Sequence, residues 1–360
     1  MKKLVFLLLS IISIVTLHSQ TRNYSNEFLA IGVDAASFGK SNAVVASTGN
    51  VNSTYWNPAG LTQIKNKQVS LMHASYFANI ANYDFGAYAL PLDENSALGI
   101  SIVRFGVDDI LDTRKLIADD GVTVVPFRDL PRFSAADYAF TISYARKPFN
   151  KNFSYGINAK IVRRIIGDFA SSWGFGIDAG VQGKIKKYNY GVMVRDLTTT
   201  YNSWKIDDDI FNTNIQDLDN PLNRQEVPEK TEITLPSIQA GISRDFIYRR
   251  NLTINVEVDL NIRFAESNDL ISTPNLSATP AAGFEIGFRK FIFLRGGFGN
   301  FQNVKQFDQS EKLTFQPNFG LGFYYKGISI DYALTDIGDQ SATVYSNVFS
   351  LIIDWKVFGR

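Results

Sequence analysis

The stretch LTINVEVDLNIRF, residues 252–264, alternates between apolar and polar residues along its whole length. Successive side chains of a β-strand point to opposite faces, so this pattern predicts a strand with one apolar and one charged face. At roughly 3.3 Å per residue its length is about 43 Å, whereas strands of soluble sheets are usually about 5–6 residues long. The alternation therefore predicts an unusually long strand whose two faces meet different surroundings.

The same two-residue period recurs from residue 67 to the end of the chain, and almost nothing there follows a helical period. The predicted strands are 67–77, 81–91, 96–106, 137–147, 153–164, 172–184, 188–197, 235–245, 251–264, 278–289, 291–300, 313–325, 328–334 and 346–358. A soluble sandwich would bury the aromatic face of each strand and would have to protect many long edges. A closed barrel in a membrane turns that face to lipid and has no edges.

The connections between the predicted strands favour the barrel. Short turns such as 92–95 and 326–327 alternate with long loops, and the longest loops are 107–136 and 198–234. Outer-membrane barrels have short periplasmic turns and long extracellular loops. We therefore predict a 14-stranded antiparallel transmembrane barrel over residues 67–360, located in the outer membrane, with both termini periplasmic. A secreted soluble β-protein is the alternative.

The first nineteen residues differ from the rest of the chain. Lys2 and Lys3 precede an apolar run that ends near Leu17, which is the pattern of a secretory signal peptide. The run is shorter than the roughly 20 residues that a spanning helix needs, so an uncleaved anchor is the less favoured reading. Residues 1–19 are therefore predicted to direct export.

Composition excludes several chemistries. The chain has no cysteine, two histidines and a formal net charge of +1. Thiolate chemistry and disulfides are excluded, multi-histidine metal sites lack ligands, and no basic surface for nucleic acid is indicated. His73 is the only histidine left after the predicted export, and we interpret it as a residue of the barrel wall. We predict no catalytic site, cofactor or metal.

Residues 20–66 do not alternate and are rich in small residues. They contain a turn over Trp56, Asn57, Pro58, Ala59 and Gly60, in which Pro58 forces Asn57 out of the helical region and Gly60 permits a positive φ. A compact segment of this kind fits inside a barrel as a plug, and its large apolar residues would be costly in water. A disordered periplasmic arm is the alternative.

The sequence resembles a known family at this segment. The run from Phe28 to Ala35, then Phe38-Gly39, then the run from Tyr55 to Leu61 look like the start of the PorV/PorQ family, within the superfamily of FadL-like fatty-acid transporters. The resemblance implies a signal peptide, a lumenal hatch with an Asn-Pro-Ala turn and a fourteen-stranded barrel. It further implies a role in type IX protein secretion.

The first functional hypothesis follows from this resemblance. PorV-like proteins bind the C-terminal domains of secreted cargo, and some dock beside the translocon pore. Loop 198–234 places apolar residues among acidic ones, which is typical of a binding surface. The candidate partner-binding residues are Tyr201, Trp204, Ile206, Ile210 and Phe211. A solvated loop that folds over the barrel mouth is the alternative.

The second hypothesis is a FadL-like transporter of a hydrophobic molecule such as a fatty acid, in which loop 107–136 provides an apolar gate. Outer-membrane lipid surrounds such a barrel, and a lipid or detergent molecule would occupy its pocket. The predicted lumen residues Glu257, Asp259 and Arg263 are too charged for a wide apolar tunnel. We interpret these three residues as the seat of the plug.

Overall fold

A computed structural model describes residues 25–76, 79–113, 116, 123–149, 152–207, 231–248, 251–305, 310–335 and 345–355 of the 360-residue chain. The predicted signal peptide and two of the predicted partner-binding residues, Ile210 and Phe211, lie outside the described residues. Among the residues that the structure describes, no helix is both long and apolar enough to cross a membrane.

Short helical turns are confined to two places in the described chain, while strands make up most of it. The helical elements are η1 (Glu27–Ala30), α2 (Ala35–Gly39), α3 (Ser53–Trp56), η2 (Pro58–Gln63) and η4 (Phe127–Asp129). The strands are β1 (Gln68–Tyr76), β2 (Ala81–Pro91), β3 (Ser96–Leu111), β4 (Arg132–Arg146), β5 (Phe153–Ile166), β6 (Ala170–Ile185), β7 (Tyr188–Arg195), β8 (Thr200–Ile206), β9 (Thr231–Thr234), β10 (Ser237–Tyr248), β11 (Leu252–Arg263), β12 (Ile271–Thr273), β13 (Leu276–Phe288), β14 (Ile292–Lys305), β15 (Glu311–Tyr325), β16 (Ile328–Thr335) and β17 (Ser346–Asp354).

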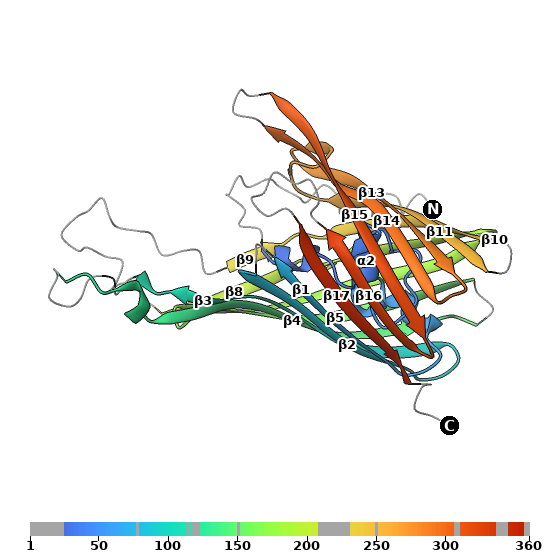
Figure 1. The fold of residues 1–360 in the computed structure, drawn as a ribbon, viewed down its shortest axis with the longest axis horizontal. Helices are drawn as coiled ribbons and strands as arrows, with labels where there is room; N and C mark the ends of the chain where they lie inside the picture. The colour runs from blue at the N-terminus through green and yellow to red at the C-terminus, as the bar shows by residue number, and fades with distance from the viewer. Residues whose placement is uncertain are drawn as a thin grey trace, which may run out of the picture.

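The strands form one closed antiparallel barrel (Figure 1). Strand β1 pairs with β2 on one side and with β17 on the other, so the first and last strands close the sheet. Strands β7 and β8 both pair with β6, one after the other along its length. On their other side, β7 pairs with β10 and β8 pairs with β9. Strands β7 and β8 thus occupy one position in the wall, β9 and β10 occupy another, and β12 only extends the edge of β13, so the barrel has 14 strand positions. The predicted fold class is confirmed.

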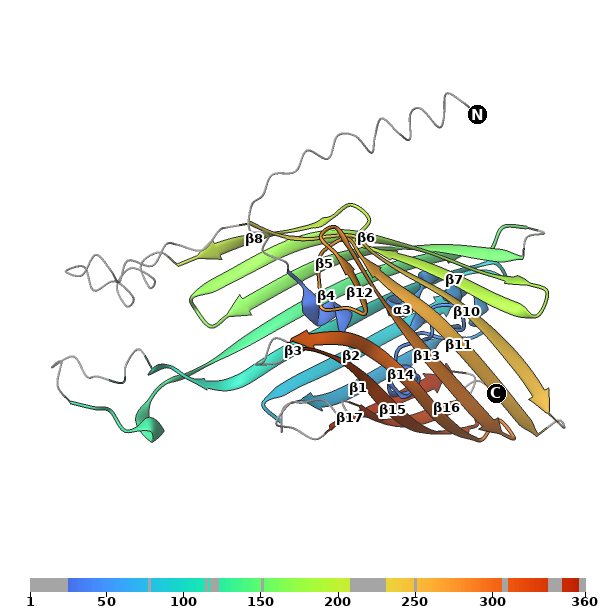
Figure 2. The same ribbon diagram turned by 90° about the horizontal axis from the view of Figure 1, so that it is seen from above.

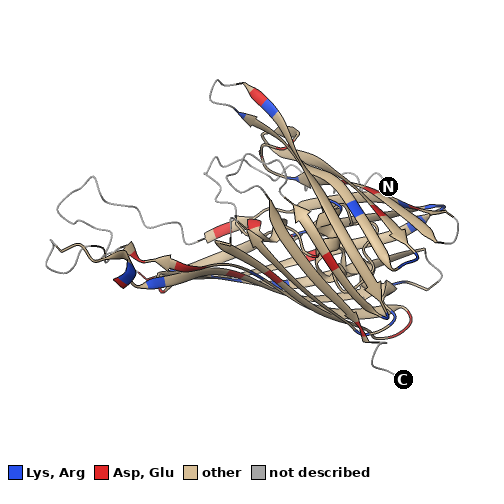
Figure 3. Cartoon of the chain, in the orientation of Figure 1, with Lys and Arg blue, Asp and Glu red and all other residues tan. Residues whose placement is uncertain are grey.

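Alternation along β11 shows which way the faces point. Val256, Val258 and Leu260 are exposed, whereas Glu257 and Asp259 are almost fully buried. Lys, Arg, Asp and Glu occupy few positions along the strands, most of which are coloured tan (Figure 3). The apolar face therefore lies outside and the polar face lines the lumen.

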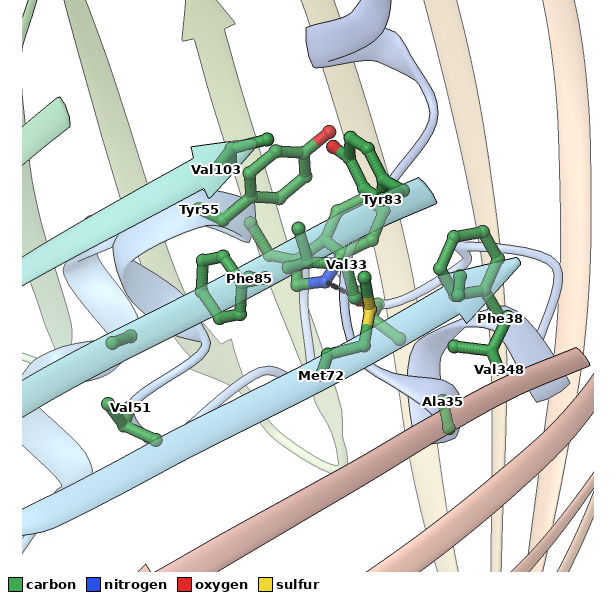
Figure 4. Close-up of a cluster of buried hydrophobic side chains, with 14 of the residues drawn as sticks. Val33, Ala35, Phe38, Val51, Tyr55, Met72, Tyr83, Phe85, Val103 and Val348 are labelled. Atoms are coloured by element: carbon green, nitrogen blue, oxygen red, sulfur yellow. Dashed lines mark hydrogen bonds between the residues drawn. The ribbon is translucent and has the colours of Figure 1, made fainter. Parts of the chain in front are cut away.

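Residues 25–66, here called the N-terminal segment, lie inside the barrel (Figure 2). Val33, Tyr55 and other apolar residues of the segment pack against Met72, Tyr83 and Phe85 of the adjacent wall (Figure 4). Gly39 of α2 lies so close to Gly320 of β15 that a Cβ on Gly39 would be 2.9 Å from the Gly320 Cα. Small residues thus bring the segment into direct contact with the wall.

Several strands extend further than the alternation predicts. Strand β3 continues to Leu111 and β4 begins at Arg132, so both enter the predicted loop 107–136. Strands β8 and β9 lie within the predicted loop 198–234. These extensions are held by hydrogen-bonded ladders, and a ladder beyond the apolar band does not need alternating apolar side chains.

Candidate functional site

A cavity of about 690 Å³, here called the loop-side cavity, opens above the N-terminal segment toward the long loops. A volume in this range suits a small organic molecule. One part of its lining is apolar and aromatic. These residues include Leu29, Ile31, Phe38, Tyr55, Trp56, Val103, Phe105 and Ile262. The N-terminal segment and several wall strands therefore build the cavity together.

Arg195, the last residue of β7, is the notable cation in this cavity. Its guanidinium carbon lies 4.4 Å from the centre of the Tyr55 ring and 5.9 Å from that of Trp56. Stacking of this kind holds the planar group by cation–π attraction while leaving its N–H groups available. Within the described residues, Arg195 makes no ion pair and donates no hydrogen bond, although it carries five N–H donors.

A buried charge cluster lies next to Arg195. Lys160 Nζ is 2.8 Å from an oxygen of Asp178 and 2.6 Å from one of Asp196, and all three side chains are almost inaccessible. Lys160 and the two carboxylates together carry one surplus negative charge, which the nearby Arg195 offsets. Because the charges are then balanced, a ligand does not need a charged group to accept a hydrogen bond from Arg195.

The position of Asp196 depends on a bulge between β7 and β8. Val194 faces Ala179 and Tyr201 faces Phe175, so the register shifts across residues 196–199. Asp196 has a φ of 52°, and its backbone N–H donates to the Asp178 carboxylate at 2.8 Å. The bulge therefore turns Asp196 into the lumen, as bulges often re-aim a side chain.

A second cavity of about 1170 Å³ lies on the opposite side of the N-terminal segment, toward the short turns. Its lining is mostly polar and includes Lys40, Asn50, Lys65, Asn152 and Lys184. No residue lines both this cavity and the loop-side cavity. The N-terminal segment therefore separates an aromatic chamber from a polar one.

Two of the three residues predicted to seat the segment contact it directly. Glu257 accepts a hydrogen bond from the backbone N–H of Ala46 at 2.6 Å and pairs with Lys40 Nζ at 3.2 Å. Asp259 accepts from the backbone N–H groups of Val44 and Val45, at 3.0 and 3.1 Å. Among the described residues, Arg263 forms no ion pair or hydrogen bond with the segment; it pairs with Asp269 at 3.4 Å instead.

A third polar anchor holds the segment on the side of β17. Asp34 caps α2, and its carboxylate accepts a hydrogen bond from Ser350 Oγ at 2.9 Å. Burial, with the negative charge of Asp331 nearby, raises the pKa of Asp34 to about 6. Asp34 is therefore ionised at neutral pH only at a cost to stability.

The turn from Trp56 to Gly60 joins the segment to β5 and β6. Asn57 is extended, as expected before proline, and its amide donates to the carbonyls of Val45 and Val181. Gly60 does not use the positive φ that glycine permits; among the described glycines, positive φ occurs at other positions. Gly60 serves close packing instead, since a Cβ there would collide with the Thr48 carbonyl oxygen.

The predicted partner-binding residues that the structure describes belong to a strand. Tyr201, Trp204 and Ile206 lie in β8, which is paired with β6. Trp204 lies under the Arg164 guanidinium, with 5.1 Å between that group and the ring centre, so it takes part in contacts of the wall itself. Tyr201 is exposed. The structure thus leaves Tyr201 as the one exposed aromatic residue among these three.

Comparison with known proteins supports the fold. The chain is similar to a solved FadL homologue from Pseudomonas aeruginosa, with 13% identity, a TM-score of 0.52 and coverage of 90% of this chain and 98% of that one. It is also similar to the toluene transporter TbuX from Ralstonia pickettii, with the same identity, TM-score and coverage. The toluene transporter TodX from P. putida matches at 11% identity and a TM-score of 0.54, over 90% of this chain and 98% of that one.

These structures define the class of fold, a FadL-like barrel of fourteen strands. No protein-family model matches the chain, and no curated protein matches it in sequence.

Proposed function

We propose that the protein is a non-enzymatic outer-membrane barrel that binds a small molecule with an apolar body and a hydrogen-bond-accepting head group in the loop-side cavity. The observation that carries the proposal is Arg195, which lines the cavity, stacks on Tyr55 and donates no hydrogen bond to the part of the chain that the structure describes. Tyr55 and Trp56 provide surface for the apolar body of the ligand, and Arg195 binds its head group. A carboxylate such as that of a fatty acid is the strongest acceptor for a guanidinium.

The exterior supports placement in a bilayer, because the outward residues of β11 are apolar over a length that matches the apolar band of outer-membrane barrels. The N-terminal segment acts as the plug of this barrel, since it separates the two cavities and contacts the wall on several sides. Toluene transporters among the similar structures show that the fold serves passage of apolar molecules in those proteins.

Binding of a matched pair of ligands tests the proposal. Dodecanoic acid and dodecane would be titrated into purified protein, with the fluorescence of Trp56 and its neighbours as readout. The Arg195→Met variant should bind the acid about tenfold or more weakly, because a hydrogen bond to a charged group contributes about 1.5–3 kcal/mol. The affinity for dodecane should stay unchanged.

Arg263→Met is the matched control, since Arg263 lines the same cavity but is paired with Asp269. It should bind both ligands as the unaltered protein does. Equal affinity of Arg195→Met and the unaltered protein for the acid would contradict the proposal. Heat-modifiable electrophoretic mobility verifies that each variant is a folded barrel.

A second candidate function is the one implied by the resemblance to PorV/PorQ, binding of secreted cargo or a translocon pore at the cell surface. The observation that favours it is the β3–β4 hairpin, which projects well beyond the rest of the barrel (Figure 1). Val124 and Phe127 on this projection are 66% and 64% exposed. Co-purification from detergent extracts tests this candidate: partners should be retained by the unaltered protein and lost with Phe127→Ser.

A further inference from the structure

The outer surface of β1, β2 and β3 carries a row of polar side chains. His73 faces Asp84 and Asp84 faces Arg104 in the ladders of these strands. His73 Nδ1 lies 2.7 Å from Asp84, and Arg104 lies 3.6 Å from Asp84 and 3.0 Å from Asp108. The side chains of His73 and Asp84 are 56% and 42% exposed. We call these four residues the exterior polar row.

Alternation places this row outside the barrel. The neighbours Met72, Tyr83 and Val103 are buried and pack toward the N-terminal segment (Figure 4). Successive residues of a strand point to opposite faces, so His73, Asp84 and Arg104 point away from the lumen. The row therefore lies on the surface that, on other strands, is apolar.

The apolar exterior is shorter here than on the opposite wall. On β11 the outward residues are apolar from Leu252 to Leu260, about 20 Å along the membrane normal for a strand tilted by roughly 40°. On β3 only Leu98, Ile100 and Ile102 precede Arg104, which corresponds to about 15 Å or less on the same estimate. On β1 only Val69 and Leu71 precede His73. A tilt of the whole barrel would shift this band but would not lengthen it.

A bilayer of uniform thickness that fits β11 therefore places the exterior polar row at the depth of the lipid chains. Charged side chains on the lipid face of a barrel are destabilising at that depth. Another protein surface with complementary charges would remove this contact with lipid.

We infer that the exterior polar row is an interface with a second copy of this chain in the membrane. The acidic side chain of Asp84 lies next to the basic side chain of Arg104 in the row. A two-fold axis along the membrane normal leaves each residue of the second copy at the same depth in the membrane. At the interface, the residues of its row run in the opposite order. An axis between Asp84 and Arg104 thus sets each Asp84 against the Arg104 of the second copy, which makes the surface self-complementary. This inference needs the membrane placement proposed above but not the ligand.

Cysteine cross-linking tests the interface directly, because the chain contains no cysteine. Two differently tagged chains, Asp84→Cys and Arg104→Cys, would be co-expressed at low level and oxidised in intact outer membranes. The expected product is a covalent dimer that carries both tags. The matched control is a pair of chains with Val258→Cys, which is 48% exposed on the opposite wall and should stay monomeric.

Charge reversal gives a second readout on proteins without cysteine. Arg104→Asp should convert a dimer into a monomer in lipid nanodiscs, and Arg104→Asp combined with Asp84→Arg should restore the dimer. A covalent product with a different outer-membrane protein would overturn the inference in favour of a foreign partner. Absence of any product from folded cysteine variants would overturn it in favour of lipid contact with a locally thinned bilayer.

Discussion

Two parts of the barrel wall each direct a pair of carboxylates into the lumen, but the two pairs have different kinds of partner. Asp178 and Asp196 are paired with Lys160, which belongs to the wall itself. On β11, Glu257 pairs with Lys40, and both Glu257 and Asp259 accept hydrogen bonds from backbone N–H groups of the N-terminal segment. The first two carboxylates have their cation without the segment, whereas Glu257 has its cation only when the segment is in place. Strand β11 is therefore the part of the wall that depends on the segment.

The largest expected effect comes from breaking the cluster within the wall. Lys160→Met removes the cation that pairs with both Asp178 and Asp196 and leaves the two carboxylates buried side by side. Removal of one partner of a buried ion pair destabilises a protein by about 3–5 kcal/mol. Because two carboxylates lose their partner here, we expect the free energy of unfolding to fall by about 4 kcal/mol. Urea unfolding of the barrel in detergent measures the loss.

The matched control for this variant combines Lys160→Met with Asp178→Asn and Asp196→Asn. Because all three groups are then uncharged, most of the lost stability should return. An unchanged urea midpoint in Lys160→Met alone would show that water in the loop-side cavity solvates the carboxylates.

The next effect tests the wall that depends on the segment. Lys40→Met leaves Glu257 without its cation but keeps the backbone donors of residues 44–46, so a loss of about 3 kcal/mol is expected. The loss should be local. Chymotrypsin should cleave near Phe38 and Tyr55 in folded barrels of this variant, but not in the unaltered protein.

Lys65→Met serves as the control for Lys40→Met, because Lys65 is an exposed residue of the same segment. Its chymotrypsin pattern should match that of the unaltered protein. If both variants were equally resistant, the segment would be held by its other contacts, and the comparison between the two walls would fail.

A smaller effect concerns pH and the third anchor of the segment. The pKa of Asp34 is raised from 3.8 to about 6, so the folded protein binds this proton more tightly than the unfolded chain does. The resulting stabilisation is present at low pH and is lost as pH rises through 6. Between pH 4 and 7 the contribution should fall by about 2 kcal/mol.

The difference between the unaltered protein and Asp34→Asn isolates this titration from that of other groups. Urea midpoints of the two proteins should converge at pH 4 and separate at pH 7, where Asp34→Asn should be the more stable one. Parallel curves across this range would show that Asp34 titrates normally.

Much of the fold could be predicted from alternation alone, because each strand has one face on the lumen. The stretch 252–264 shows this most clearly, and the inward Glu257 and Asp259 could be recognised as contacts for something inside the barrel. Register between strands is not encoded in the alternation of either strand. The sequence therefore did not reveal that Lys160, Asp178 and Asp196 meet.

The place of Arg195 in the loop-side cavity was also missed, although the sequence carries one signal for it. Outward residues have even numbers on β7, such as Val192, and odd numbers on β8, such as Tyr201. Strands β7 and β8 occupy one position in the wall, so a switch of the outward residues from even to odd numbers requires a bulge between them. Bulges often lie beside functional sites. Reading the phase, rather than only the presence of alternation, would have pointed to residues 195–199.

Closure of the barrel by β1 and β17 also fixes an order of assembly. These strands come from opposite ends of the described chain, so their ladder is the contact that requires the greatest part of the chain to be in place. The N-terminal segment precedes β1 directly and contacts β5, β6, β11 and β17 from within. The N-terminal segment must therefore be enclosed while the wall closes, so the barrel and its internal contacts form in the same step.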